Sequence, residues 1–212
     1  MFKIIDRNKW SREPYFKHFF NNVRCTYSIT ANVEITKALE FSRSKGCKLY
    51  PVLLFCLTKV VNRHEEFRTS FNDRGELGIW EQMHPCFTYF HNDTETFSNI
   101  WTGFDEDFDR FLNAYQEDIT KYGDVHEMYA KPDAPANIFP VSMIPWTTFT
   151  AFNLNIFAEG DYLLPIFTFG KYIAEGEKTL IPLSVQVHHG VCDGFHVSRF
   201  IRELEEMLNT QL

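Results

Sequence analysis

The segment VHHGVCDGFHVSRF, residues 187–200, gathers side chains that can carry out acid–base or metal chemistry. His188, His189, Cys192, Asp193 and His196 all fall within ten residues. A neutral imidazole can accept a proton, and imidazole or thiolate groups can also ligate a metal ion. Histidines near a helix start are also often structural. Three interpretations are therefore open: a metal site, a buried structural cluster, or a catalytic base.

The spacing of these side chains argues against a metal site. It matches neither H-E-x-x-H nor a cysteine–histidine finger. His188 and His189 are adjacent, so on a strand they point to opposite faces. We therefore expect no metal. In the structural interpretation the histidines are satisfied by hydrogen bonds, and Asp193 caps the following helix.

In the catalytic interpretation one histidine acts as a general base, which typically contributes about 10²–10⁴ in rate. Its second nitrogen must be held so that the first can accept the proton, and Asp193 would organise the site. The chain has no G-x-S-x-G nucleophile motif and no glycine-rich phosphate or dinucleotide motif. A base without a nucleophile of its own suggests direct transfer between two bound substrates.

Length and composition indicate one domain over residues 1–212 with a sizeable core. The chain has 44% hydrophobic residues and 22 phenylalanines, which can fill a core or line an apolar pocket. Its net charge of -7 argues against a nucleic-acid partner, because proteins that bind nucleic acid usually carry a stripe of basic residues.

Cysteine usage and the amino terminus favour a cytoplasmic protein. The number of cysteines, five, is odd and they form no C-x-x-C pair, so reduced thiols are expected. MFKIIDRNKW has no apolar run typical of a signal peptide. LYPVLLFCLTKVV is short and contains Lys59, so we expect a buried helix and no membrane span.

Periodicity predicts the elements that must position the histidine segment. We expect helices at 11–20, 36–44 (capped by Thr36), 51–63, 104–123 and 195–212. We expect strands at 25–36, 85–91, 147–157, 163–173 and 180–189, a hairpin at 67–82, and a loop at 131–140. These intermixed elements predict an α/β (α+β) fold with a large mixed sheet flanked by helices. The histidines then lie between the last strand and the last helix, where Gly190 and Gly194 permit a tight connection.

The string QVHHGVCDGFHVSRF resembles the signature of the chloramphenicol acetyltransferases. The likeness extends over almost the whole chain, because further strings occur in that family's order: W-S-R-E, K-L-Y-P-V, E-F-R, H-P-C-F-T-Y-F-H, T-E-T-F-S, V-S-M-I-P-W, F-N-L-N and G-K-Y. The resemblance implies a CoA-dependent acyltransferase fold and a homotrimer whose active sites lie at subunit interfaces. It also implies that acetyl-CoA, a co-substrate, donates its acetyl group to the 3-hydroxyl of chloramphenicol.

The resemblance further implies roles for four residues. His189 would remove the hydroxyl proton, so that the oxygen attacks the thioester directly and no acetyl-enzyme forms, while His188 faces the interior. Asp193 would pair with Arg12 in a buried, architectural ion pair. Ser142 would hydrogen-bond the tetrahedral oxyanion.

The same resemblance implies two sets of binding residues. The antibiotic pocket would include Phe19, Cys25, Tyr27, Phe97, Tyr129, Leu154, Ile166 and Thr168. Contacts to CoA would come from Tyr50, Lys171 and Tyr172. Pro140 departs from some members and has no backbone N–H to donate there.

Two other functions remain open from sequence. The chain could acetylate a different hydroxylated compound with the same chemistry, or it could retain a ligand without turnover. No nucleic-acid or membrane partner is expected.

Overall fold

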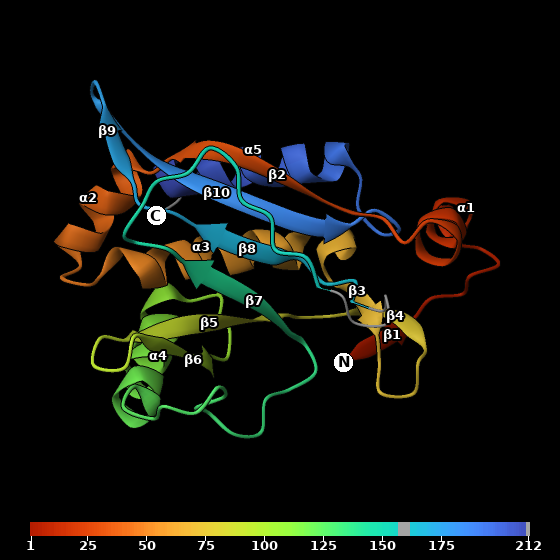
Figure 1. The fold of residues 1–212 in the computed structure, drawn as a ribbon, viewed down its shortest axis with the longest axis horizontal. Coiled ribbons are helices and arrows are strands. Elements are labelled where there is room, and N and C mark those ends of the chain that lie inside the picture. Colours follow the sequence, from red (N-terminus) through yellow and green to blue (C-terminus); the bar gives the residue numbers. More distant parts are fainter. Residues whose placement is uncertain (157–161, 211–212) are drawn as a thin grey trace.

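The computed structural model describes residues 1–156 and 162–210, and a mixed β-sheet dominates it (Figure 1). Strands β5–β7 and β7–β8 pair in parallel, while the remaining pairs of this sheet are antiparallel. The prediction of a large mixed sheet is therefore confirmed. In spatial order its strands are β2 (Thr26–Glu34), β10 (Lys178–His188), β8 (Ile166–Phe169), β7 (Ile138–Met143), β5 (His84–His91) and β6 (Thr96–Trp101), and β9 (Ile173–Glu175) pairs with β10.

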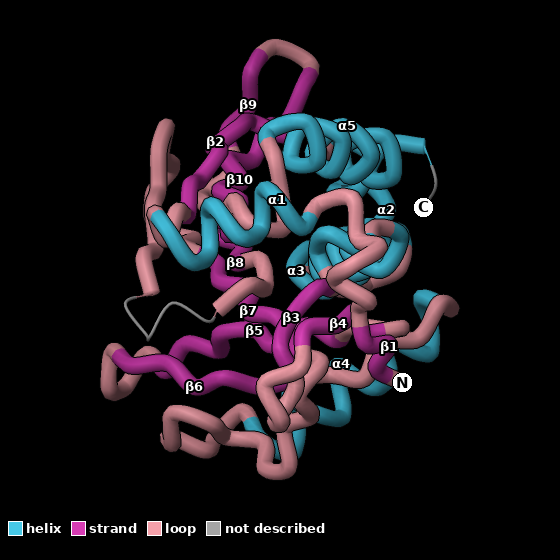
Figure 2. The backbone as a smooth tube through the Cα atoms, turned by 90° about the vertical axis from the view of Figure 1, so that its right-hand side faces the viewer, coloured by secondary structure: helices cyan, strands magenta, loops and turns pink. Residues whose placement is uncertain are grey.

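Helices cover the sheet, and Figure 2 shows α2, α3 and α5 together on one side of it. A smaller sheet lies beside them and has the order β1 (Phe2–Ile4), β4 (Leu77–Trp80), β3 (Thr69–Phe71). The helices are α1 (Glu13–Phe16), η1 (Lys17–Asn22, a π-helix), α2 (Thr36–Ser44), α3 (Leu49–Arg63), η2 (Glu65–Phe67), α4 (Phe108–Tyr122) and α5 (Gly194–Thr210).

Helix α3 forms the centre of the core, as its apolar sequence predicts. Its residues are buried almost without interruption, while Lys59 is half-buried and reaches Glu106 at 3.4 Å. Pro51 lies in the first turn, where its missing N–H costs no helical hydrogen bond. Within residues 1–156 and 162–210, none of the helices has both the length and the hydropathy needed to cross a membrane.

Strand β10 positions the histidine segment. It lies between β2 and β8, and residues 181–188 are all buried, which is typical of a strand covered on both faces. The strand ends at His188 and α5 begins at Gly194. The predicted strand over 180–189 is thus confirmed to within two residues at either end, and His189 follows a rigid strand directly.

Two segments near the centre of the chain differ from the sequence-based prediction. The loop expected over 131–140 contains the start of β7. Residues 147–156 form no strand, and Phe157 lies outside the described residues. The backbone N–H groups of Phe152 and Leu154 donate instead to the side chains of Thr30 and Gln186. Side-chain acceptors therefore replace the ladder partners that a strand would need.

Smaller differences concern the ends of elements. Thr36 is the first residue of α2 and not its cap, because its hydroxyl accepts from the Thr179 N–H and donates to Glu34. The predicted helix over 11–20 begins at Glu13 and continues as a π-helix to Asn22. The expected strand 163–173 is divided into β8 and β9. The sequence pattern predicted neither strand β1 nor strand β6.

Candidate active site

His189 is held by contacts to its backbone and to its ring. Its N–H donates to the Cys25 carbonyl at 2.9 Å, and its own carbonyl accepts from Nη2 of Arg12 at 2.9 Å. Its ring stacks on Phe19, with centroids 3.9 Å apart and planes 17° apart, and meets the edge of Tyr27 at 5.2 Å. The imidazole is 31% exposed, so a held ring remains open to a reactant.

Asp193 lies beside the second nitrogen of this ring. Its Oδ1 is 3.2 Å from Nδ1 of His189, although the ring is not oriented to donate a good hydrogen bond to it. The carboxylate is placed to balance charge if the ring is protonated at its other nitrogen. It can therefore stabilise an imidazolium without taking the proton itself.

Arg12, which immediately precedes α1, fixes the turn that carries His189. Its guanidinium donates to both carboxylate oxygens of Asp193 at 2.7 Å and to the Gly190 carbonyl at 2.8 Å, besides its bond to His189. The hydrogen bonds from Arg12 hold the pKa of Asp193 below its usual range. The pair is only partly buried in the isolated chain, since Asp193 is 37% exposed.

His188 faces the interior and has the environment of a structural histidine. Its Nδ1 accepts from the Gly190 N–H at 3.0 Å, and it is 3% exposed. Burial, assisted by the neighbouring His189, lowers the pKa of His188 to about 4. The ring is therefore neutral at physiological pH and shapes the turn.

The histidine segment does not form a metal cage in this geometry. Among the described residues, the one group of three such ligands within 4.8 Å of one another is His91, Asp93 and His126. His196 contributes instead to the turn, since its Nδ1 accepts from the Asp193 N–H at 2.9 Å.

Glu66 joins the site although sequence reasoning gave it no role. Its Oε1 lies 3.2 Å from Nε2 of His196 and 2.8 Å from Nη2 of Arg199. Because Nδ1 of His196 accepts a bond, the proton of the neutral ring is at Nε2 and faces Glu66. Glu66 belongs to the string E-F-R, but only the fold brings η2 against the start of α5.

Ser142 lies in a different part of the chain, on the wall of an apolar cavity of about 740 Å³. It is on β7, where it opposes Thr168 of β8. Five of the residues expected in the antibiotic pocket also line this cavity: Phe97, Tyr129, Leu154, Ile166 and Thr168. Phe97, Tyr129 and Leu154 are 44%, 63% and 44% exposed, an unusual concentration of uncovered apolar surface.

The other three expected pocket residues lie beside His189. Phe19 and Tyr27 contact its ring, and the backbone carbonyl of Cys25 accepts a hydrogen bond from its N–H. The structure therefore separates the predicted site residues into two groups. The histidine group contains Arg12, Phe19, Cys25, Tyr27, His189 and Asp193, and the serine group contains Phe97, Tyr129, Ser142, Leu154, Ile166 and Thr168.

The sheet register gives the separation of the two groups within one chain. Ser142 opposes Thr168, and Thr168 opposes Ser184. His189 follows Ser184 by five positions (189 − 184), or about 16 Å at about 3.3 Å per residue, and two strand spacings add about 10 Å across the sheet. The two residues are therefore roughly 15–20 Å apart in one chain, which is too far to contact one reacting centre.

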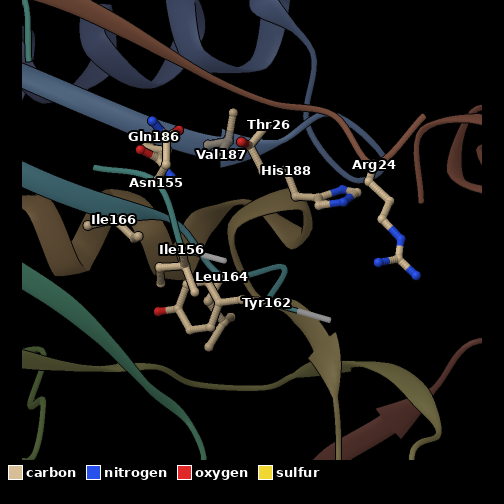
Figure 3. Close-up of a pocket in the computed structure, with 10 residues that line it drawn as sticks. All are labelled: Arg24, Thr26, Asn155, Ile156, Tyr162, Leu164, Ile166, Gln186, Val187 and His188. Atoms are coloured by element: carbon tan, nitrogen blue, oxygen red, sulfur yellow. The ribbon is translucent and has the colours of Figure 1, made fainter. Parts of the chain in front are cut away.

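A smaller cavity of about 390 Å³ lies next to the larger one. Figure 3 shows the ring of His188 extending from the end of β10, with Ile156, Tyr162 and Leu164 gathered below it. Ile166 and these three apolar residues line both cavities. Because the two cavities share these side chains, the smaller cavity at the end of β10 borders the wall of the larger cavity, where the serine group lies.

The three expected CoA contacts are not brought together. Tyr50 lies on α3, and its hydroxyl donates to the Val141 carbonyl at 3.1 Å. Lys171 and Tyr172 are exposed between β8 and β9, where the Lys171 N–H donates to the Thr147 carbonyl. Pro140 lines the large cavity.

Comparisons with known proteins show the family of this chain. Residues 1–205 match the family described as chloramphenicol acetyltransferase. A chloramphenicol acetyltransferase of Clostridium perfringens is 55% identical over 206 residues, which cover 97% of this chain and 94% of that protein.

Two solved structures share the fold. One, named chloramphenicol acetyltransferase, has a TM-score of 0.86 at 23% identity and covers 98% of this chain and 100% of its own. The dihydrolipoamide acetyltransferase of Azotobacter vinelandii has a TM-score of 0.67 at 16% identity, covering 93% and 86%. The mixed sheet with flanking helices is thus the fold of the CoA-dependent acyltransferases. Given the match over nearly its full length, the chain belongs to the chloramphenicol acetyltransferase family.

Proposed function

We propose that this protein transfers the acetyl group of acetyl-CoA to the 3-hydroxyl of chloramphenicol and thereby inactivates the antibiotic. Membership of the family supports this activity, and the observation that carries it for this chain is the imidazole of His189, which is held in place and partly exposed. We also propose that residues 1–212 form one domain and that it works in the cytoplasm, where its free cysteines remain reduced.

His189 is the general base in this proposal. One ring nitrogen takes the proton of the 3-hydroxyl while the oxygen attacks the thioester carbon, and the proton then passes to the departing CoA sulfur. The Asp193 carboxylate, 3.2 Å from Nδ1, favours the transient imidazolium. No acetyl-enzyme and no metal ion is needed in either step.

Ser142 is the donor to the oxyanion that forms on the thioester carbonyl. One such donor is typically worth about 10²–10³ in turnover. Its place on the wall of the large apolar cavity supports this role, because the aromatic ring and the dichloroacetyl group of the antibiotic need an apolar surface. Phe97, Tyr129, Leu154, Ile166 and Thr168 would provide it.

The assembly we propose is a homotrimer in which each active site combines the histidine group of one chain with the serine group of its neighbour. Two observations support this. His189 and Ser142 are too far apart within one chain, and the apolar residues around the serine group are exposed. In a cyclic assembly the same pair of surfaces meets three times, so every site is complete.

Tyr50, Lys171 and Tyr172 remain our proposed contacts to CoA, with Lys171 the natural partner for a phosphate. Pro140 has no N–H, so any polar contact at that position must come from its carbonyl.

The activity is tested by mixing the purified protein with acetyl-CoA and chloramphenicol and following the release of CoA thiol. We expect rapid release with chloramphenicol, none with its 3-deoxy analogue, and none from His189→Ala. A folded trimer that releases no thiol would refute the proposal. A higher kcat/KM for another alcohol in an acceptor panel would instead identify a different substrate for the same chemistry.

A further inference from the structure

We propose that His91, Asp93 and His126 form a binding site for a divalent transition metal of the zinc class. His91 ends β5, Asp93 lies in the turn before β6, and His126 lies in the segment after α4. One ligand atom from each lies within 4.8 Å of the others. None of the three is among the residues that line the two cavities described above, so this site is separate from the proposed acetyl-transfer site.

The hydrogen bonds around His91 prepare it as a ligand. The Ser98 hydroxyl donates to the Val125 carbonyl at 2.7 Å, so its hydrogen is already used. The 2.8 Å contact between Ser98 Oγ and Nε2 of His91 therefore has the ring N–H as donor. The neutral ring then keeps the lone pair of Nδ1 for a metal. Metal-bound histidines commonly donate their other N–H in this way.

Asp93 and His126 are the other two ligands, and both are exposed, in contrast to His91. The rings of His91 and His126 stack with centroids 4.1 Å apart, and Oδ2 of Asp93 lies 3.7 Å from Nε2 of His126. A tetrahedral zinc ion with bonds of 2.0–2.1 Å places its ligands about 3.3 Å apart. In the stacked arrangement the lone pairs of the two rings do not converge on one ion, so the His126 ring must turn out of the stack to bind. Because Asp93 and His126 are exposed, both side chains are free to make this movement, while buried His91 stays fixed.

The chemistry of the ligands selects the ion. Two imidazoles and one carboxylate suit Zn²⁺, Cu²⁺ or Ni²⁺, whereas Mg²⁺ and Ca²⁺ prefer sites made of oxygen ligands. Three protein ligands leave a fourth position for water.

A metal at this place would hold one wall of the large cavity. The segment after α4 already follows β6, since the Asn99 N–H donates to the Met128 carbonyl at 2.9 Å and Asn99 bridges to Tyr129. Met128 and Tyr129 line the cavity. The metal would tie the start of this segment to the β5–β6 turn and so restrict the movement of that wall.

The test is calorimetric titration of the assembled, tag-free protein with zinc chloride at neutral pH, with no substrate present. We expect one ion per chain and an increase in the melting temperature. His126→Gln and Asp93→Asn should each weaken binding at least 10-fold. Ser98→Ala should weaken it by about 10–100-fold through the loss of its bond to His91. Circular dichroism establishes that each variant is folded.

Two variants serve as matched controls. His18→Gln removes an exposed histidine far from the proposed ligands in sequence, and His189→Ala removes the proposed base; both should bind zinc like the wild type. The proposal is overturned if the wild type binds no zinc, or if folded His126→Gln and Asp93→Asn both keep the full affinity of the wild type. Because the readout is metal binding, its failure is distinguishable from a failure of acetyl transfer.

Discussion

At the scale of single residues, the site depends on two imidazole rings: the ring of His189 is held in position, and the ring of His188 is buried. His189 is open to reactants, whereas its neighbour His188 is enclosed and bonded to Gly190. The two histidines thus leave the end of one strand with different environments. Residue spacing alone indicated only this region. The resemblance to a family distinguished the two rings, and their different contacts give the physical reason for that distinction.

Ser142→Ala tests the oxyanion role. We expect kcat to fall by about 10²–10³ with a smaller change in KM, because the bond strengthens only as charge develops on the oxygen. Steady-state kinetics with both substrates measures the two effects separately. Thr88→Ala, which alters another hydroxyl residue on the wall of the same cavity, is the matched control. An unchanged kcat in Ser142→Ala would remove the serine from the mechanism.

The lowered pKa of His188 predicts that the stability of the folded protein depends on pH. Burial lowers its pKa to about 4, whereas the unfolded value is about 6.5. The unfolded chain therefore binds more protons between these values. The resulting stability is complete above about pH 6.5 and is lost as the pH falls toward 4, by about 2 kcal/mol at pH 5.

Chemical denaturation at pH 7 and pH 5, at one protein concentration, measures this loss. His188→Asn should show a decrease smaller than that of the wild type by about 2 kcal/mol, and His18→Asn, at an exposed position, should behave like the wild type. Equal pH dependence in wild type and His188→Asn would contradict the assignment.

At the scale of elements, the turn after β10 is held in place by side chains from two other segments of the chain. Arg12, just before α1, binds its carbonyls and Asp193, and Glu66 of η2 contacts His196 at the start of α5. These ties connect residues far apart in the chain. They explain how a short turn can hold the ring of His189 at a constant position.

Arg12→Lys tests the hydrogen bonds that Arg12 makes to the turn after β10. Lysine keeps the charge but cannot bind two carbonyls and a carboxylate together, so we expect a loss of about 1–3 kcal/mol in unfolding free energy and a lower kcat. Arg7→Lys is the control, because Arg7 pairs with Glu13 at a 46% exposed position where an ion pair contributes less than about 1 kcal/mol. Equal losses in the two variants would show that Arg12 has no special role.

The elements also show what sequence patterns can and cannot predict. The apolar run of α3 and the final strand were predicted well, since burial on all sides leaves a continuous signal. Residues 147–157 were predicted as a strand, yet the side chains of Thr30, Ser184 and Gln186 bond to backbone groups of Phe152 and Leu154. Such partners are distant in sequence. The pairing of Arg12 with Asp193 came from the resemblance to a family, and Glu66 came from neither source.

At the scale of the whole molecule, we propose that one chain carries two half-sites. The histidine group and the serine group lie roughly 15–20 Å apart by strand register, and apolar side chains are exposed around the cavity that Ser142 lines. A neighbouring chain would cover this surface and supply His189 to it. In this proposal the chains must associate for activity, and not for stability alone.

The most direct test of this central claim is complementation between two inactive chains. His189→Ala and Ser142→Ala are unfolded together, refolded as mixed trimers, and assayed for thiol release. If each site takes its histidine and serine from different chains, about a quarter of the sites in a random one-to-one mixture are intact, and about that share of wild-type activity should return. If both residues act from one chain, every site carries a lesion and the mixture stays inactive, which would contradict the account.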